Sequence, residues 1–459
     1  MNVVAIHPHH SHHTQPILAS GLLRFITAGS VDDGKSTLIG RLLYDTGNVA
    51  SDQVEAIRTS SARRGFTGLD LSLLTDGLQA EREQGITIDV AYRYFATTRR
   101  KFIIGDAPGH EQYTRNMVTA ASTADLAILM VDARKGIITQ TRRQAYLAHL
   151  LGIRKLVLAI NKMDLVDWRR EAFDGIVDEF DRFAAWLGCA RPQAIPLSAL
   201  NGENVVKRGQ DTPWYRGPTL LEYLHEAPAR RDVADGPLRF PVQRVVRVML
   251  GNAATAVPGG EAPNPMAAEF RGYQGTLGGG ELRVGDTVRV LPSGRLTRVG
   301  SIKLAGQVLT RATADQAVVI GLEDDIDLSR GDMLVDPEQP AESRRELTAE
   351  LCWLAEEPLQ PGRKYLIKHT TRTVTGLFPA LEYRTNVNTL EHEPGPATGH
   401  MNDIVRVRLR LQQPLFVDPY ARNRTTGSFI VIDPATRATL AAGIVAEEAA
   451  DSSPATARP

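Results

Sequence analysis

Apolar and polar positions in the first half of the chain follow two different periods. Short, continuous apolar runs predict buried strands, which lie at 22–28, 101–104, 125–131, 155–160 and 194–197. Residues 169–187 instead carry apolar side chains at steps of three and four, which predicts an amphipathic helix whose apolar stripe belongs to the core. Strands that alternate with helices predict an α/β domain with a largely parallel sheet.

The pattern changes after residue 236, where short strands follow one another with glycine turns. We expect strands at 240–248, 275–277, 284–290, 301–303 and 317–320, which together predict a small antiparallel β-barrel. A second β-rich block runs from about Leu347 to Val445 and predicts a second barrel. In its middle strand, Arg406 and Arg408 alternate with apolar residues, which indicates a half-exposed edge or face. These arginines either contact a ligand or lie on a solvated face, and we favour the solvated face.

These patterns divide the chain into a few segments. We predict a disordered histidine-rich tail at 1–20, the α/β domain at 21–233, the two barrels at 234–342 and 343–446, and a disordered tail at 447–459. A stretch rich in Gly, Pro and Ala at 251–270 predicts a surface loop. The five histidines of the first tail are compatible with a transition-metal site, but a weakly basic disordered segment is the simpler interpretation.

Composition narrows the class of protein only slightly. The chain has 459 residues, with 53 Lys and Arg balanced by 53 Asp and Glu, so overall charge neither suggests nor excludes a nucleic-acid partner. The two cysteines, Cys189 and Cys352, form no disulfide framework, which is typical of a reduced, cytoplasmic protein. The N-terminus lacks a signal-peptide pattern, and no apolar run approaches the ~20 residues of a membrane span.

The strongest motif lies between the first predicted strand and a predicted helix. Residues 29–36 read G-x-x-x-x-G-K-S, in which glycines let successive N–H groups converge on a phosphate at the positive end of a helix. In this motif Lys35 reaches the β- and γ-phosphates, and the Ser36 hydroxyl coordinates Mg²⁺. A surface glycine loop is the alternative, but the strand–loop–helix context favours a phosphate site. We assign to it Gly29, Ser30, Val31, Asp32, Asp33, Gly34, Lys35, Ser36 and Thr37.

Further short motifs follow later strands in the order that a guanine-nucleotide site requires. After strand 101–104, Asp106 can hold Mg²⁺ through water, and the N–H of Gly109 can meet the γ-phosphate. The residues of this motif are Asp106, Ala107, Pro108 and Gly109. Each motif is weak alone, but their shared position after strands makes the set specific.

The next two motifs select the base. Asp164 offers a carboxylate to guanine N1–H and N2–H₂, a pair of donors that adenine lacks, which predicts GTP over ATP. Lys162 is expected to lie along the base, and the backbone after strand 194–197 is expected to meet guanine O6. The residues of these two motifs are Asn161, Lys162, Met163 and Asp164, and Ser198, Ala199 and Leu200.

Two residues are candidates for the reaction itself. Thr87, in the segment before the strand that leads to Asp106, can supply a second Mg²⁺ ligand when the γ-phosphate is present, which makes that segment a switch. The alternative is an ordinary strand threonine. His110 is our candidate catalytic residue, because it can orient and polarise a water for attack on the γ-phosphorus. The alternative is a histidine at a helix start with no chemistry.

With these motifs, nearly the whole chain resembles the translation-factor GTPases such as elongation factor Tu. The stretches 76–95, 106–117, 198–205 and 270–276 are similar to the large, GTPase subunit of the heterodimeric bacterial sulfate adenylyltransferase. The resemblance implies a P-loop GTPase domain followed by two antiparallel β-barrels, with GTP and Mg²⁺ as cofactors. Asp33 and Ser36 depart from elongation factor Tu but fit the sulfate-activating branch. The loop at 251–270 is longer than expected even there.

The resemblance also implies a partner and a pathway. In that family, GTP hydrolysis drives formation of adenylyl sulfate and diphosphate by a small catalytic subunit, which transfers AMP from ATP to sulfate, and reduction of the product leads to sulfide and cysteine. The chain contains no His-x-Gly-His motif, no Ser-Gly-Gly-x-Asp-Ser motif and no second phosphate loop. We therefore expect that AMP transfer belongs to another chain and that no adenylyl sulfate kinase is fused to this one. We expect neither a membrane nor a nucleic-acid partner. A translation factor that delivers aminoacyl-tRNA and a regulatory GTPase remain the rival interpretations.

Overall fold

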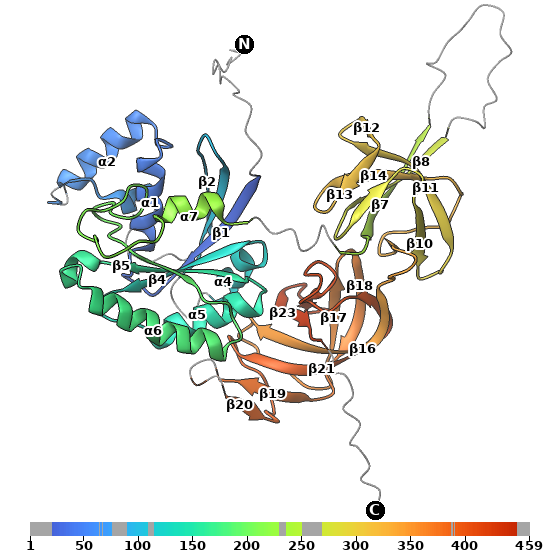
Figure 1. Ribbon diagram of the computed structural model, residues 1–459. Coiled ribbons are helices and arrows are strands. Elements are labelled where there is room, and N and C mark those ends of the chain that lie inside the picture. The colour runs from blue at the N-terminus through green and yellow to red at the C-terminus, as the bar shows by residue number, and fades with distance from the viewer. Residues whose placement is uncertain are drawn as a thin grey trace, which may run out of the picture. The chain divides into compact units, whose positions relative to one another are not determined.

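In the computed structural model, the chain divides into two units, residues 1–229 and 230–459 (Figure 1). The N-terminal unit contains the helices and one mixed sheet, and the C-terminal unit is built of strands. The residues that the structure describes are 21–63, 65–66, 68–75, 90–108, 114–228, 236–249, 269–386, 389 and 391–447. Among the helices in these ranges, none is both long and apolar enough to cross a membrane.

The sheet of the N-terminal unit has six strands in the order β2-β3-β1-β4-β5-β6. All neighbouring strands pair in parallel except β2, which pairs antiparallel with β3 at one edge. Every residue of β4 is buried, as expected for a parallel strand covered on both faces. The strands are β1 Leu22–Ala28, β2 Ala91–Ala96, β3 Lys101–Asp106, β4 Leu126–Asp132, β5 Lys155–Asn161 and β6 Gln193–Pro196. The predicted α/β fold with a largely parallel sheet is therefore confirmed.

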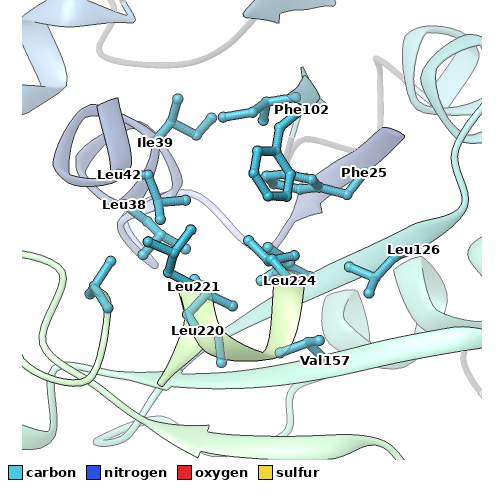
Figure 2. Packing of buried hydrophobic residues seen from close by; sticks show 14 of the residues in the cluster. Phe25, Leu38, Ile39, Leu42, Phe102, Leu126, Val157, Leu220, Leu221 and Leu224 are labelled. Atoms are coloured by element: carbon cyan, nitrogen blue, oxygen red, sulfur yellow. The ribbon is translucent and has the colours of Figure 1, made fainter. Parts of the chain in front are cut away.

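Helices cover both faces of this sheet. Leu38 and Leu42 of α1 and Leu220 and Leu224 of α7 pack onto one face, against side chains that include Phe102 (Figure 2). Figure 1 shows α4, α5 and α6 on the opposite face. The helices are α1 Lys35–Asp45, α2 Ser51–Arg63, α4 Thr114–Ser122, α5 Thr139–Leu150, α6 Arg170–Trp186 and α7 Leu220–Glu226, with 3-10 turns η1 Leu71–Leu74 and η3 Met163–Val166.

The helix predicted at 169–187 is confirmed as α6, which is one residue shorter at each end. The apolar stripe is core, as expected: its buried members are Phe173, Ile176, Phe180, Phe183 and Ala184. At the last helix of the unit, the Thr219 hydroxyl accepts a hydrogen bond from Glu222 N–H while the Glu222 carboxylate accepts one from Thr219 N–H. This capping box explains why α7 begins at Leu220, directly after a proline-containing loop.

Each of the two barrels in the C-terminal unit closes through a pairing between strands that lie far apart in its sheet order. The first sheet has the order β10-β15-β7-β8-β14-β11-β12 and closes through β10–β11. The second has the order β16-β23-β22-β17-β18-β21-β19-β20 and closes through β16–β21. Closure leaves fewer free strand edges, and it encloses one apolar core in each barrel, around Phe240 and Tyr273 in the first and around Trp353 and Tyr365 in the second.

The strand bounds refine the sequence predictions. The first barrel consists of β7 Arg239–Met249, β8 Glu269–Thr276, β10 Thr287–Leu291, β11 Leu296–Leu304, β12 Gln307–Leu309, β14 Ala317–Leu322 and β15 Met333–Val335, beside a separate pair β9 Glu281–Arg283 and β13 Arg311–Thr313. The second consists of β16 Glu342–Trp353, β17 Lys364–His369, β18 Arg372–Leu377, β19 Leu381–Thr385, β20 His392–Pro394, β21 Ile404–Val417, β22 Ser428–Ile432 and β23 Thr439–Val445.

Two of the predicted barrel segments were misplaced. The strand expected at 284–290 begins only at Thr287, because Gly285 adopts a φ of 93° and Asp286 N–H closes a turn onto Arg283 O. The loop expected at 251–270 lies mostly outside the described residues, but its last two residues, Glu269 and Phe270, belong to strand β8.

The arginine-rich strand β21 forms a face and not an edge, because it pairs with β16, β18 and β19. On that face Arg406 pairs with Glu350 at 2.9 Å, and Arg410 pairs with Glu346 at 2.9 Å. Arg408 contacts Glu382 at 3.3 Å. These arginines therefore neutralise glutamates of neighbouring strands, which agrees with the solvated-face interpretation.

The two barrels contact each other through a buried ion pair. Arg239 of β7 is 2% exposed and donates two hydrogen bonds of 2.8 Å to the Asp418 carboxylate, which follows β21. Asn423 Nδ2 donates to Gly278 O at 2.8 Å in the same interface. Because a bidentate arginine pair fixes both distance and orientation, these contacts hold the two barrels in one arrangement.

The burial of His369 predicts that the stability of the C-terminal unit depends on pH. Its ring is buried and its Nε2 contacts Thr426 O at 2.8 Å. Burial lowers the pKa of His369, and Arg372 lowers it further, although the Thr426 contact and Asp418 oppose this shift. Since an unfolded histidine titrates near 6.5, the unfolded chain binds more protons just below that pH. We therefore expect the free energy of unfolding to fall as pH drops below about 6.5.

The measurement is denaturant unfolding at several pH values, followed through Trp353 in a variant whose other tryptophans are phenylalanine. His369→Asn should make the pH dependence shallower by up to about 1.4 kcal/mol per pH unit. The exposed His400→Asn is the matched control and should leave the slope unchanged. An unchanged slope in His369→Asn would contradict the assignment.

Candidate functional site

The loops that carry the sequence motifs gather at one edge of the six-stranded sheet. The phosphate-loop residues follow β1, Asp106 ends β3, Asn161 ends β5 and Ser198 follows β6. Because β1, β3, β4, β5 and β6 run in parallel, their carboxyl ends meet at this edge, which is where ligands of open α/β sheets bind. The sheet topology alone therefore brings these four motifs together.

The phosphate loop leads directly into α1. Gly34 takes a φ of 94° before the helix begins at Lys35. The Lys35 ammonium donates to Gly29 O and Ser30 O, both at 2.9 Å, and the residue is only 7% exposed. Burial lowers the pKa of Lys35, while Asp106 and Asp33 favour its charged form. The lysine thus bridges the loop with its cation held next to two carboxylates.

Two buried side chains brace the same loop. The Asp33 carboxylate accepts a hydrogen bond of 2.6 Å from Ser30 N–H. Burial raises the pKa of Asp33, although this hydrogen bond and Lys35 counteract the rise. From α5, Gln144 Nε2 donates to Gly29 O at 3.1 Å. The first residues of the loop are therefore held from both sides by protein groups.

Asn161 joins three loops. Its Nδ2 donates to Asp33 O at 2.7 Å, and its Oδ1 accepts from Ala199 N–H at 2.9 Å. A Cβ at Gly34 would lie 2.4 Å from Asn161 Nδ2, so the glycine permits this approach. We expected the backbone at 198–200 to face guanine O6, and the structure shows that Ala199 N–H already has a partner within the protein.

Lys162 and Asp164 lie on the turn after β5. Lys162 has a φ of 62°, and Asp164 is half-buried in the first turn of η3, next to the buried Met163. The Lys162 ammonium donates to Asp32 O in the phosphate loop and pairs with Asp132 Oδ2 at 3.0 Å. The turn at 161–164 is therefore tied directly to the loop at 29–36.

Asp106 is the last residue of β3 and interacts electrostatically with Lys35. Its Oδ1 accepts a hydrogen bond of 3.1 Å from the Thr27 hydroxyl, and the residue is 3% exposed. Ser36, the second residue of α1, is half-buried. Val31, Ala107, Pro108 and Leu200 lie in the same loops, and Thr37 is the third residue of α1. Thr87, Gly109 and His110 lie outside the described residues.

Comparison with known protein families identifies a GTP-binding domain over the residues that form these loops. Residues 20–229 match the family described as the Elongation factor Tu GTP binding domain, and residues 346–446 match the GTP-eEF1A C-terminal domain-like family. The Bifunctional enzyme CysN/CysC of Mycobacterium tuberculosis (strain ATCC 25618 / H37Rv) is 51% identical over 94% of this chain and 68% of that protein. Sulfate adenylyltransferase subunit 1 of Cellvibrio japonicus (strain Ueda107) is 49% identical over 93% of this chain and 87% of that protein.

The chain belongs to the sulfate adenylyltransferase subunit 1 family. Its N-terminal unit contains the GTP-binding domain of the translation-factor GTPases. The alignment with a solved structure of sup35 complexed with GDP covers 96% of this chain and 97% of the sup35 chain, with 23% identity and a TM-score of 0.42. That similarity is too low for its ligand to bear on this member of the subunit 1 family.

Several residues that position the site in this family member were missed by the sequence motifs. Gln144 contacts the phosphate loop, and Thr27 contacts Asp106. Arg41 of α1 donates to Ala199 O at 3.2 Å. Asp132, the last residue of β4, pairs with both Arg134 and Lys162. The rule that placed Asp106 and Asn161, a polar side chain directly after a buried strand, also applies to Asp132 and would have found it.

We predict that Gly34→Ala weakens guanine-nucleotide binding at least tenfold, because its Cβ would displace Asn161 and its backbone would be strained at positive φ. The measurement is titration with fluorescent GDP. Gly175→Ala is the matched control, since a Cβ there meets no heavy atom within 4 Å. Equal GDP affinity in Gly34→Ala and the control would show that nucleotide binding does not require the close approach of Gly34 to Asn161.

Proposed function

We propose that this chain is the GTPase subunit of a sulfate adenylyltransferase and couples GTP hydrolysis to formation of adenylyl sulfate and diphosphate from ATP and sulfate. The observation that carries the proposal is the 48–51% identity to the curated subunit 1 and CysN/CysC proteins over more than nine-tenths of this chain. The adenylyl sulfate would enter sulfate assimilation toward sulfide and cysteine.

The geometry supports a guanine nucleotide as the ligand of this edge of the sheet. Lys35 lies at the head of α1, where the N–H groups of a helix start favour phosphate. Asp164 lies beyond Lys162 and has the acceptor oxygens that guanine N1–H and N2–H₂ require. Asn161 holds the phosphate-binding and base-binding loops at a constant spacing. We assign nucleotide binding to the residues named above for these loops.

The donors near the phosphate loop fit Mg²⁺, which prefers oxygen ligands. The Ser36 hydroxyl and the Asp106 carboxylate, the latter through water, would hold the ion, with Thr87 as an added ligand when the γ-phosphate is present. When bound, the ion would neutralise charge on the phosphate oxygens. Thr27 keeps the Asp106 carboxylate oriented by donating to its Oδ1.

We propose His110 as the catalytic residue, with the role of orienting and polarising the attacking water. Lys35 stays paired to the loop carbonyls and to the phosphates, so it stabilises charge without transferring a proton. Release of the segment around Thr87 after hydrolysis would make it the switch that reports the nucleotide state.

AMP transfer is assigned to a separate small catalytic subunit, with which this chain forms a heterodimer. The proposal draws support from the printed name "subunit 1" and from the absence of adenylyltransferase motifs in this sequence. The CysN/CysC relative is longer than this chain, which covers 68% of it.

The first test combines the purified chain with its co-encoded small subunit. We expect the pair to form adenylyl sulfate from ATP and sulfate, and to form more when GTP is added. The measurement is conversion of radiolabelled sulfate with GTP, with a non-hydrolysable GTP analogue and without nucleotide. GTP-dependent binding of aminoacyl-tRNA with no effect on sulfate would favour the translation-factor alternative, and dependence on neither would favour a regulatory GTPase.

A second test concerns the base. Asp164→Asn should move the preference from guanine toward xanthine nucleotides, because an amide can donate a hydrogen bond where the carboxylate only accepts. Competition between GDP and xanthosine diphosphate measures this shift. Asp174→Asn is the control, because Asp174 forms an exposed pair with Arg170 on α6. Unchanged discrimination in Asp164→Asn would remove Asp164 from base recognition.

A further inference from the structure

Asp132 is a buried carboxylate that none of the sequence motifs includes. It ends β4, and in the parallel pairing of β4 with β5 it lies opposite Asn161. Its side chain is 0% exposed. Ala133 N–H donates to Asn161 O at 2.9 Å, so the backbone beside the carboxylate is also fixed to the base-reading strand. The sheet thus places Asp132 directly beside the Asn161–Lys162 turn.

Two cations share this carboxylate. Asp132 Oδ1 accepts hydrogen bonds of 3.0 Å from both the backbone N–H and Nε of Arg134. Asp132 Oδ2 accepts from Arg134 Nη2 at 2.6 Å and from Lys162 Nζ at 3.0 Å. Burial alone would raise the pKa of Asp132, but the bonds from Arg134 and Lys162 outweigh it and lower the pKa. The carboxylate is therefore charged and fully engaged.

Lys162 needs such an anchor for two reasons. Its backbone has a φ of 62°, a conformation that residues other than glycine adopt at a cost. Its long side chain must also extend from the base-reading turn to Asp32 O in the phosphate loop, which costs side-chain entropy. A buried partner at the end of a buried strand offsets both costs before any nucleotide arrives.

We propose that Asp132 is a positioning residue for guanine-nucleotide binding, which holds Lys162 across the phosphate loop, while Arg134 covers the pair on its solvent side. This inference rests on the proposed function only for the identity of the ligand. Asp132 does not touch the nucleotide and acts through Lys162. Arg134, with 47% of its side chain exposed, limits the access of water to the carboxylate.

The test measures the dissociation rate of fluorescent GDP from the full chain and from Asp132→Asn, which has the same shape without the charge. We expect release to be faster by about tenfold or more, because a charged hydrogen bond to Lys162 is lost. The increase should persist at high salt, since buried pairs are screened little. The exposed Asp174→Asn should release GDP at the wild-type rate.

A double-mutant cycle separates positioning from general destabilisation. In a Lys162→Met background, Asp132→Asn should have little further effect, whereas a purely structural role would add the same factor in both backgrounds. An unchanged release rate in the single variant would overturn the proposal. So would slower release that disappears at high salt, because the carboxylate would then act only by repelling phosphate.

The result of this double-mutant cycle does not depend on whether the chain takes part in adenylyl sulfate formation. If the wild-type chain binds GDP and the cycle shows coupling, but GTP leaves adenylyl sulfate formation unchanged, then the inference stands and the proposed function fails. If the wild-type chain binds adenine nucleotides in preference to GDP, the guanine assignment fails, and the same cycle measured with ADP decides whether Asp132 positions Lys162.

Discussion

The site depends above all on the side-chain amide of Asn161. One amide donates to the phosphate loop and accepts from the loop after β6, while its own strand supplies the base-reading turn. Three loops that are distant in sequence therefore share a single buried residue at the edge of the sheet. Because the amide has both a donor and an acceptor, no aliphatic side chain and no ionised carboxylate could make both contacts.

Around this amide, cations lie close to carboxylates. Asp33 and Asp106 interact with the Lys35 cation, and Asp132 pairs with both Lys162 and Arg134. Each buried charge has an opposite partner nearby, which is the condition under which burial of ions is tolerated. The cations Lys35, Lys162 and Arg134 are thus each held beside a carboxylate by contacts within the protein.

Much of this could be predicted from the sequence, because the strands that carry the motifs are short apolar runs of low ambiguity. The first strand was predicted at 22–28 and is β1 Leu22–Ala28, and the motif residues follow the strands as expected. The contact of Gln144 with Gly29 could not be predicted in the same way, since it depends on how helix α5 packs against a loop far away in the sequence. The start of β10 was missed because turn chemistry at Gly285 overrode the apolar alternation.

The buried pair between Arg239 and Asp418 constrains how the C-terminal unit can change. Replacing one barrel by a barrel that lacks the charge partner would leave the other half of the pair buried without its counterion, a situation that costs about 3–5 kcal/mol in comparable proteins. The two barrels are thus poor candidates for exchange with barrels from other proteins, although each has its own core. A natural or engineered recombination within this unit would have to transfer both barrels together, with Arg239 and Asp418 retained.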